Sequence, residues 1–128
     1  MRKLWLVVYN LLGVPSIWIF FRIFALFNSK VREGLNGRRD LFSELDRSLA
    51  VLKGRKRVLI HCSSLGEYQQ SVPLAEQFIR KGYCVVNSFF SPSGFRHCKV
   101  SGTEMAKTYL PMDSYGNVSE FLEKVSPE

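Results

Sequence analysis

Serine, glycine and glutamate residues with the potential for chemistry occur in two short segments, each of which follows an apolar run. The segments are SSLGE, from Ser63 to Glu67, and SPSG, from Ser91 to Gly94. An ionised carboxylate such as that of Glu67 can take a proton from a hydroxyl group while the hydroxyl oxygen attacks an electrophile. Serine hydroxyls and backbone amides can bind a sugar or a phosphate, and glycine lets a bulky ligand approach the backbone. General base catalysis on a hydroxylated acceptor is therefore one interpretation of these segments.

This interpretation selects Glu67 as the catalytic base and six residues as acceptor-binding groups. The six are Ser63, Ser64, Gly66, Ser91, Ser93 and Gly94. A second interpretation is purely structural, because Ser64 and Glu67 have the spacing of a capping box. Pro73 complicates it, since a helix interior needs the N–H that proline lacks. A helix that begins near Ser71 leaves Glu67 in a loop, and one that begins near Gly66 must accommodate Pro73. Both interpretations stay open on the residues alone.

Apolar runs that are separated by turn residues predict the strands and helices on either side of these two segments. A buried strand over KRVLIHCSS leads into an amphipathic helix that stops at Gly82, a natural C-cap residue. A second strand, from Tyr83 to Ser91, is closed by PSG. Residues 101–107 are expected to form a short helix or loop, TYLPMD a third strand and SYGNVSEFLEKVSPE a final helix.

Strands that alternate with helices through short connections are typical of a parallel α/β sheet covered by helices. Ligands of such sheets bind at the carboxyl ends of the strands. SSLGE and SPSG both follow carboxyl ends, so we expect them to line one edge of the sheet. The predicted fold class is thus α/β, with part of a Rossmann-like domain in residues 57–128.

The N-terminal part of the chain is basic and apolar. Residues 1–57 hold 12 Lys and Arg against 4 Asp and Glu, whereas residues 58–128 hold 6 against 7. An apolar segment from Leu4 to Phe27 would reach about 36 Å as a helix, enough to cross a hydrocarbon core of about 30 Å. Asn10, Pro15 and Arg22 interrupt it, and Pro15 is expected to kink it. Residues 1–30 therefore predict a membrane-associated helix, which either spans the bilayer or lies in one leaflet.

Basic residues beside an apolar segment indicate anionic lipid rather than nucleic acid as the partner. After the membrane segment, residues 31–56 are expected to be an amphipathic linking helix, within which Asn36-Gly37 marks a turn and Asp40 caps the helix that follows it. Its apolar residues recur at helical spacing as far as about Lys53. They are Leu41, Phe42, Leu45, Leu49 and Leu52, and packing on the core is their favoured role.

Three cysteines, Cys62, Cys84 and Cys98, are too few and too scattered for a disulfide framework, so buried reduced thiols are expected. His61-Cys62 and His97-Cys98 resemble paired metal ligands. Adjacent residues of a strand point to opposite faces, however, and no pair has the C-x-x-C spacing of zinc sites. We therefore expect no metal site.

HCSSLGE, SPSG and YLPMD, in this order behind a membrane segment, resemble the N-terminal part of the 3-deoxy-D-manno-octulosonic acid (Kdo) transferases of lipopolysaccharide synthesis. That family typically has H-x-x-S-x-G-E, T-P-T-G and Y-L-P-x-D at similar spacings. Departures are Ser91 and Ser93 in place of threonines and Met112 in place of an aromatic residue. The segment around GRRDLFSEL departs more.

The resemblance implies the N-terminal half of a GT-B glycosyltransferase, which binds a lipid A precursor as acceptor at the cytoplasmic face of the inner membrane. The other half would bind the donor CMP-Kdo, so the 128-residue chain alone is expected to be inactive. Transfer would invert the anomeric centre without a metal or other cofactor, and Glu67 would be the general base. The alternative is a non-catalytic, membrane-anchored α/β binding module, in which Glu67 only caps a helix.

Overall fold

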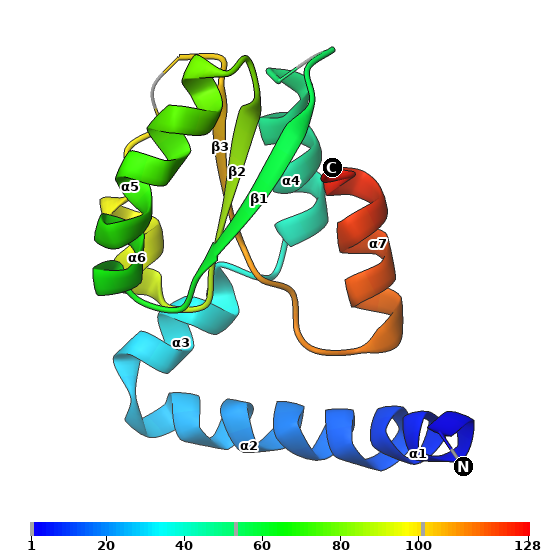
Figure 1. Ribbon diagram of the computed structural model, residues 1–128. Helices are drawn as coiled ribbons and strands as arrows, with labels where there is room; N and C mark the ends of the chain where they lie inside the picture. Colours follow the sequence, from blue (N-terminus) through cyan, green and yellow to red (C-terminus); the bar gives the residue numbers. More distant parts are fainter. Residues whose placement is uncertain (1, 53, 101) are drawn as a thin grey trace.

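A parallel sheet of three strands forms the centre of the computed structural model, which describes residues 2–52, 54–100 and 102–128 (Figure 1). The strands are β1 (Arg57–Cys62), β2 (Cys84–Phe89) and β3 (Met105–Tyr109), and β2 is the central one. Their register sets Leu59 beside Val86 and Val86 beside Ala106. The predicted α/β class is confirmed, with an apolar helix ahead of the sheet.

Helices cover both faces of the sheet. Helices α5 (Leu65–Arg80) and α6 (Pro92–His97) lie on one face, and α4 (Leu41–Ala50) and α7 (Tyr115–Val125) lie on the other (Figure 1). Because side chains alternate along a strand, Val86 enters the core on the α4 and α7 side and Phe89 packs on the α5 and α6 side. All three cysteines are buried and free, as expected.

The PSG segment after β2 begins a short helix, because Ser91 caps α6 and Pro92 occupies its first turn, where a missing N–H costs nothing. One local prediction was wrong. Residues 105–107, expected to be helix or loop, begin β3; Ser101 lies outside the described residues. Lys107 belongs to this strand although its side chain is charged. Its Nζ donates to the carbonyl oxygens of Phe95 and Cys98 at 2.9 and 3.0 Å and thereby caps the end of α6.

Residues 29–50 form two helices rather than one. Helix α3 (Ser29–Asn36) is capped by Asn28, and a turn separates it from α4. Asp40 occupies the N-cap position of α4, but its side chain makes no capping hydrogen bond, contrary to the prediction. Leu41, Leu45 and Leu49 are buried against β3 and α7, which confirms the favoured packing role. The expected end of this helix at Lys53 lies outside the described residues.

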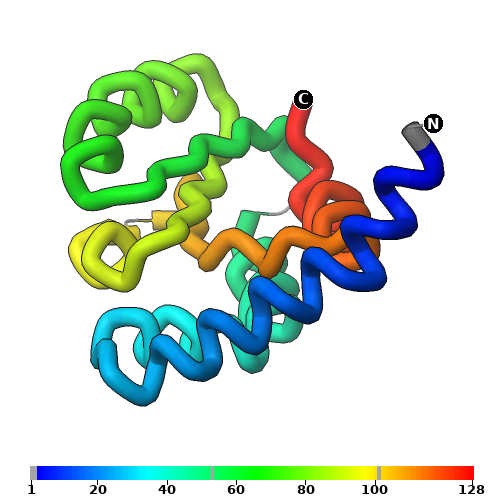
Figure 2. The backbone as a smooth tube through the Cα atoms, turned by 90° about the horizontal axis from the view of Figure 1, so that it is seen from below, coloured from blue at the N-terminus to red at the C-terminus, as the bar shows by residue number. Residues whose placement is uncertain are grey.

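The N-terminal helix runs along the carboxyl edge of the sheet. It consists of α1 (Arg2–Val8), a π-helical turn η1 (Tyr9–Gly13) and α2 (Val14–Phe27), which follow one another in a single rod (Figures 1 and 2). A kink was expected at Pro15, but the helix continues through it. Pro15 lies in the first turn of α2, directly after the π-helical turn, whose wider i→i+5 hydrogen bonds accommodate the missing N–H of proline. Residues Lys3–Phe27 are long and apolar enough to cross a membrane, with a mean hydropathy of 1.8.

One side of this helix is docked on the loop that follows β3. The Tyr9 hydroxyl donates to Asp113 Oδ2 at 2.6 Å, and Asn10 Oδ1 accepts from the N–H of Tyr115 at 3.0 Å. Ala25, near the other end, is buried. The opposite side exposes large apolar residues along its whole length: Leu4, Trp5, Leu11, Leu12, Ile19, Phe20, Ile23 and Phe27. The polar residues Asn10 and Arg22, which interrupt the apolar segment, therefore face the rest of the protein. The large apolar residues on the opposite side of the helix make no such contact and are exposed.

Candidate active site

The two polar segments begin two helices at the carboxyl edge of the sheet. Ser64 caps α5, its Oγ accepting from the N–H of Glu67 at 3.3 Å. Ser91 caps α6 in the same way, accepting from the N–H of Gly94 at 3.3 Å. Each strand thus ends in a serine cap, and the first turns of both helices are presented at the same edge.

Gly94 allows these two helix starts to touch. A Cβ atom at this position would lie 3.4 Å from the backbone carbonyl carbon of Ser64 and 2.6 Å from the Phe89 ring. Real Cβ atoms do not approach a ring that closely, so only glycine fits without a shift of the neighbours. SSLGE and SPSG are consequently side by side, the arrangement expected of segments that share one sheet edge.

Glu67 takes part in a reciprocal cap. Its Oε2 accepts from the N–H of Ser63 at 2.6 Å, while its own N–H donates to Ser64. Helix α5 begins at Leu65 and continues through Pro73, so Glu67 belongs to the first helical turn rather than to a loop. The geometry of the capping interpretation is therefore present.

Among the described residues, the capping hydrogen bond leaves one oxygen of the Glu67 carboxylate without a partner. A carboxylate offers about four lone-pair positions on its two oxygens, and the capping bond occupies one of them. Glu67 is exposed, and within the described chain its Oε1 has no hydrogen-bond donor and neither oxygen is paired with a Lys or Arg. Oε1 is thus available to accept a proton from a hydroxyl group that approaches this edge.

Ser91 and Ser93 differ from the serines before Glu67 in their surroundings. Their hydroxyls are 3.0 Å apart, and both residues line a pocket of about 210 Å³ between α2, α3 and α6. We call it the apolar pocket, because Phe21, Val31 and Phe90 supply much of its wall. Ser63, Ser64 and Gly66 lie instead on the exposed start of α5. The edge therefore combines an open carboxylate with a neighbouring sheltered pocket.

Arg38 is a residue of this edge that the sequence did not single out. Its guanidinium donates to the carbonyl oxygens of Leu110, Gly34 and Phe90 at 2.8, 2.8 and 2.9 Å. Burial lowers the pKa of Arg38 from its ordinary value. These bonds tie α3 to the ends of β2 and β3, so Arg38 holds the edge together. In the sequence, the GRRD segment shows two adjacent arginines, Arg38 and Arg39, but it does not indicate which of them packs against the sheet edge.

The members of the first histidine–cysteine pair, His61 and Cys62, point to different faces of β1, as strand geometry requires, whereas His97 ends the helix α6 and Cys98 is its C-cap residue. Cys62 is buried on the α5 and α6 side of the sheet, whereas His61 is exposed and its Nδ1 lies 3.0 Å from Ser88 Oγ. In the described ranges, no three His, Cys, Asp or Glu side chains come together in a group that could hold a metal ion.

A parallel sheet with an available carboxylate at its carboxyl edge and an apolar helix along that edge is consistent with the N-terminal half of a glycosyltransferase. A family model described as 3-deoxy-D-manno-octulosonic-acid transferase (kdotransferase) matches residues 34–128, and the chain belongs to this family. A curated bifunctional glycosyltransferase/methyltransferase of Fusobacterium nucleatum subsp. nucleatum is 27% identical over 126 residues. That alignment covers 92% of this chain and 18% of the relative, so the chain spans less than a fifth of the relative's length. No solved structure gives a significant match.

Proposed function

We propose that this chain supplies the acceptor side of a transferase that moves Kdo from CMP-Kdo to a lipid A precursor. The observation that carries the proposal is the exposed Glu67 carboxylate, with one oxygen free, beside SPSG at the carboxyl edge of a Kdo transferase domain. Ser91 and Ser93 would contact the acceptor from the apolar pocket, and Ser63, Ser64, Gly66 and Gly94 would contact it from the open side. Residues 57–128 would form the acceptor-binding domain.

In the proposed step, Glu67 Oε1 takes the proton of an acceptor hydroxyl as that oxygen attacks the anomeric carbon of Kdo. The new carbon–oxygen bond forms opposite the bond to CMP, which breaks with its electron pair remaining on the phosphate. The anomeric centre is inverted, and the proton stays on Glu67 until solvent removes it. In the two-domain arrangement implied by the family, a second domain facing this one would hold CMP-Kdo.

We further propose that the N-terminal helix lies in the plane of one leaflet. Tyr9 and Asn10 contact the loop after β3 and the start of α7, and Ala25, near the other end of the rod, is buried beside α3. A helix that crossed the bilayer while keeping these contacts would draw Asp113 and the Tyr115 amide into hydrocarbon, which is costly. An in-plane helix keeps them at the water side and buries its exposed apolar side in lipid. The cytoplasmic leaflet of the inner membrane is the proposed location.

The direct test is a transfer assay in membranes, with the donor-binding domain present. We expect radiolabelled Kdo to move from CMP-Kdo to a lipid A precursor in the presence of a metal chelator. Transfer to soluble sugars with no transfer to the lipid would contradict the proposed acceptor. Absence of any Kdo transfer by a folded, membrane-bound protein would contradict the proposed reaction.

A further inference from the structure

Helix α6, which carries the SPSG segment, is too short to hold its own position. It has only six residues, and a helix of this length is not stable by itself in water. The carbonyl groups at its end have no partner within the helix. Those of Phe95 and Cys98 accept hydrogen bonds from Lys107 Nζ at 2.9 and 3.0 Å. The end of α6 is therefore held by a side chain from β3.

Lys107 is committed to α6 and not to a carboxylate. It lies on the α5 and α6 side of the sheet, because its neighbour Ala106 belongs to the core on the other side. Within the part of the chain that the structure describes, no Asp or Glu oxygen lies within 4.0 Å of Lys107 Nζ. The ammonium lies 4.6 Å from the centroid of the Phe95 ring. A half-buried charge is costly unless it is hydrogen-bonded, and α6 supplies both its carbonyl partners and an aromatic ring.

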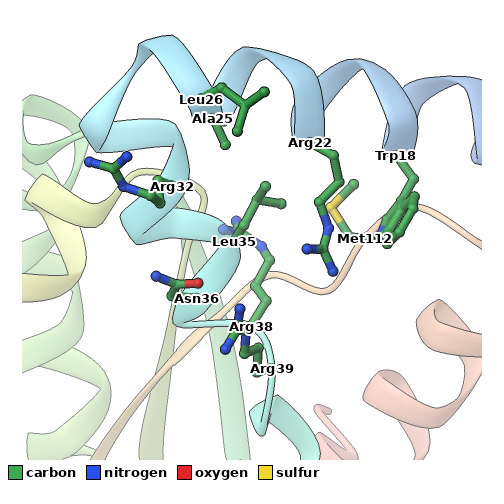
Figure 3. A pocket seen from close by; sticks show the side chains of 10 residues that line it. All are labelled: Trp18, Arg22, Ala25, Leu26, Arg32, Leu35, Asn36, Arg38, Arg39 and Met112. Carbon is green, nitrogen blue, oxygen red and sulfur yellow. The ribbon is translucent and has the colours of Figure 1, made fainter.

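Phe95 transmits this restraint to the start of the helix. Its ring stacks on Tyr109, with the centroids 4.2 Å apart and the planes at 15°. Tyr109 is itself held by Arg38, at the wall of the pocket drawn in Figure 3, whose Cζ lies 4.9 Å from the Tyr109 centroid. Gly94, directly before Phe95, is the residue that packs α6 closely against Ser64. A shift of Phe95 would therefore move Gly94 and the two serine hydroxyls of SPSG.

We propose that Lys107 is a positioning residue, which fixes α6 so that Ser91 and Ser93 meet the acceptor beside Glu67. Two carbonyl groups of α6 engage its ammonium, so it acts through that helix and not by contact with the acceptor. Misplacement by about 1 Å can cost up to about 10²-fold in rate, so a fixed helix matters here. This inference rests on the proposed function and deepens it, because it names the residue that sets one wall of the acceptor site.

The test compares Lys107→Met with Lys107→Arg in the transfer assay, with the donor-binding domain present. Methionine fills similar space but donates no hydrogen bond, whereas arginine keeps N–H donors and the charge. In Lys107→Met we expect the KM for the lipid A precursor to rise about tenfold, with the KM for CMP-Kdo unchanged and kcat within about threefold. Lys107→Arg should stay within about threefold of the wild type in all three.

Lys124→Met is the matched control. Lys124 is also a partly buried lysine with a bonded ammonium, since its Nζ lies 2.8 Å from Asp46 Oδ2. It belongs to α7, on the other side of the sheet from α6 (Figure 1). Loss of its ion pair should leave the KM for the lipid A precursor unchanged.

Hydrogen exchange of the 128-residue chain is a second readout, which requires no transfer reaction. The amides of Phe95 and Cys98 donate to the carbonyl groups of Ser91 and Gly94 within α6. They should exchange about tenfold faster in Lys107→Met and at the wild-type rate in Lys107→Arg. If Lys107→Met does not fold, Lys107→Gln replaces it, because its amide is neutral and one bond shorter. The same changes are then expected, with smaller size.

An unchanged KM for the lipid A precursor in Lys107→Met would overturn the proposal, and so would an equal rise in Lys107→Arg. A rise in the KM of both substrates would also overturn it, because that indicates a general loss of structure. If the wild-type protein transfers no Kdo, the proposed function fails, and hydrogen exchange still decides whether Lys107 fixes α6. Wild-type transfer with unchanged kinetics in Lys107→Met contradicts the positioning role alone.

Discussion

The Glu67 carboxylate and the Ser63 amide are joined by a hydrogen bond of 2.6 Å, made by Oε2, while Oε1 of the same carboxylate remains open at the sheet edge. One side chain can therefore cap a helix and accept a proton. The two roles make different demands. A cap requires any oxygen acceptor at this position, whereas a base requires a group that can be protonated.

Replacing Glu67 by glutamine should separate these roles. The glutamine carbonyl can still accept from the Ser63 amide, so we expect thermal stability within about 0.5 kcal/mol of the wild type. Proton acceptance is lost, and kcat for Kdo transfer should fall by about 10²–10⁴. The measurements are melting temperature and transfer rate with the donor domain present. Glu67→Ala should lose the cap as well, at a cost of about 1 kcal/mol. Full activity of the glutamine variant would restrict Glu67 to capping, as a non-catalytic binding module requires.

Gly94→Ala should destabilise the protein. The added methyl would meet the Phe89 ring at 2.6 Å and the Ser64 backbone at 3.4 Å, so the starts of α5 and α6 must move apart. Overpacking of this kind costs about 1–3 kcal/mol in chemical denaturation. Gly116→Ala, in the first turn of α7, is the matched control, since nothing lies within 4 Å of its added methyl. The control should be neutral or slightly stabilising. Equal effects of both substitutions would contradict the close contact at Gly94.

Arg38→Lys should cost about 2 kcal/mol of unfolding free energy although it preserves the charge. Lysine cannot reproduce the three bonds to the Gly34, Phe90 and Leu110 carbonyls, and a sheltered carbonyl left without a donor is penalised. Arg39→Lys, one residue away on the exposed side of the turn, should change stability by less than about 0.5 kcal/mol. Urea unfolding of both variants checks the difference, and similar midpoints would show that the carbonyl contacts add no stability.

Tyr68 should make stability depend on alkaline pH. Burial, assisted by a hydrogen bond with Cys98, raises the pKa of Tyr68 from 10.0 to about 12. The folded state then holds the proton more tightly than the unfolded state does. The resulting stability is fully present below pH 10 and is lost as the pH rises toward about 12. In urea unfolding across this window, wild-type stability should fall more than that of Tyr68→Phe. Parallel pH profiles of the two proteins would contradict the assignment.

Depth-dependent fluorescence quenching by brominated lipids should place both tryptophans in one leaflet. Trp5 and Trp18 are 13 residues apart, so a helix that spans the bilayer separates them in depth by about 20 Å. An in-plane helix keeps them at similar depths. The variants Trp5→Phe and Trp18→Phe each leave a single tryptophan to be measured. A depth difference near the spanning value would refute the in-plane arrangement.

Local patterns were sufficient for much of this protein. The run Val58 to Ile60, the helical spacing up to Gly82 and the Ser64–Glu67 pair each reflect hydrogen bonds or side-chain periods within a few residues, and the structure has the corresponding strand, helix and cap. Both interpretations of Glu67 followed from that local geometry. Strand alternation likewise separated His61 from Cys62. The parallel order of the sheet came from the short connections between these elements.

Contacts between distant parts of the chain decided the rest. Lys107 is polar by sequence yet extends β3, because α6 offers carbonyl groups to it. Asn10 looked like an interruption of a membrane span, and Tyr9 was not singled out at all. Only their hydrogen bonds to the Tyr115 amide and to Asp113, more than a hundred residues away, show that they dock the helix on the sheet edge. The sequence determined which residues are polar, apolar or helix-forming. Tertiary structure determined which polar groups satisfy one another, since such pairing depends on spatial proximity that no local period encodes.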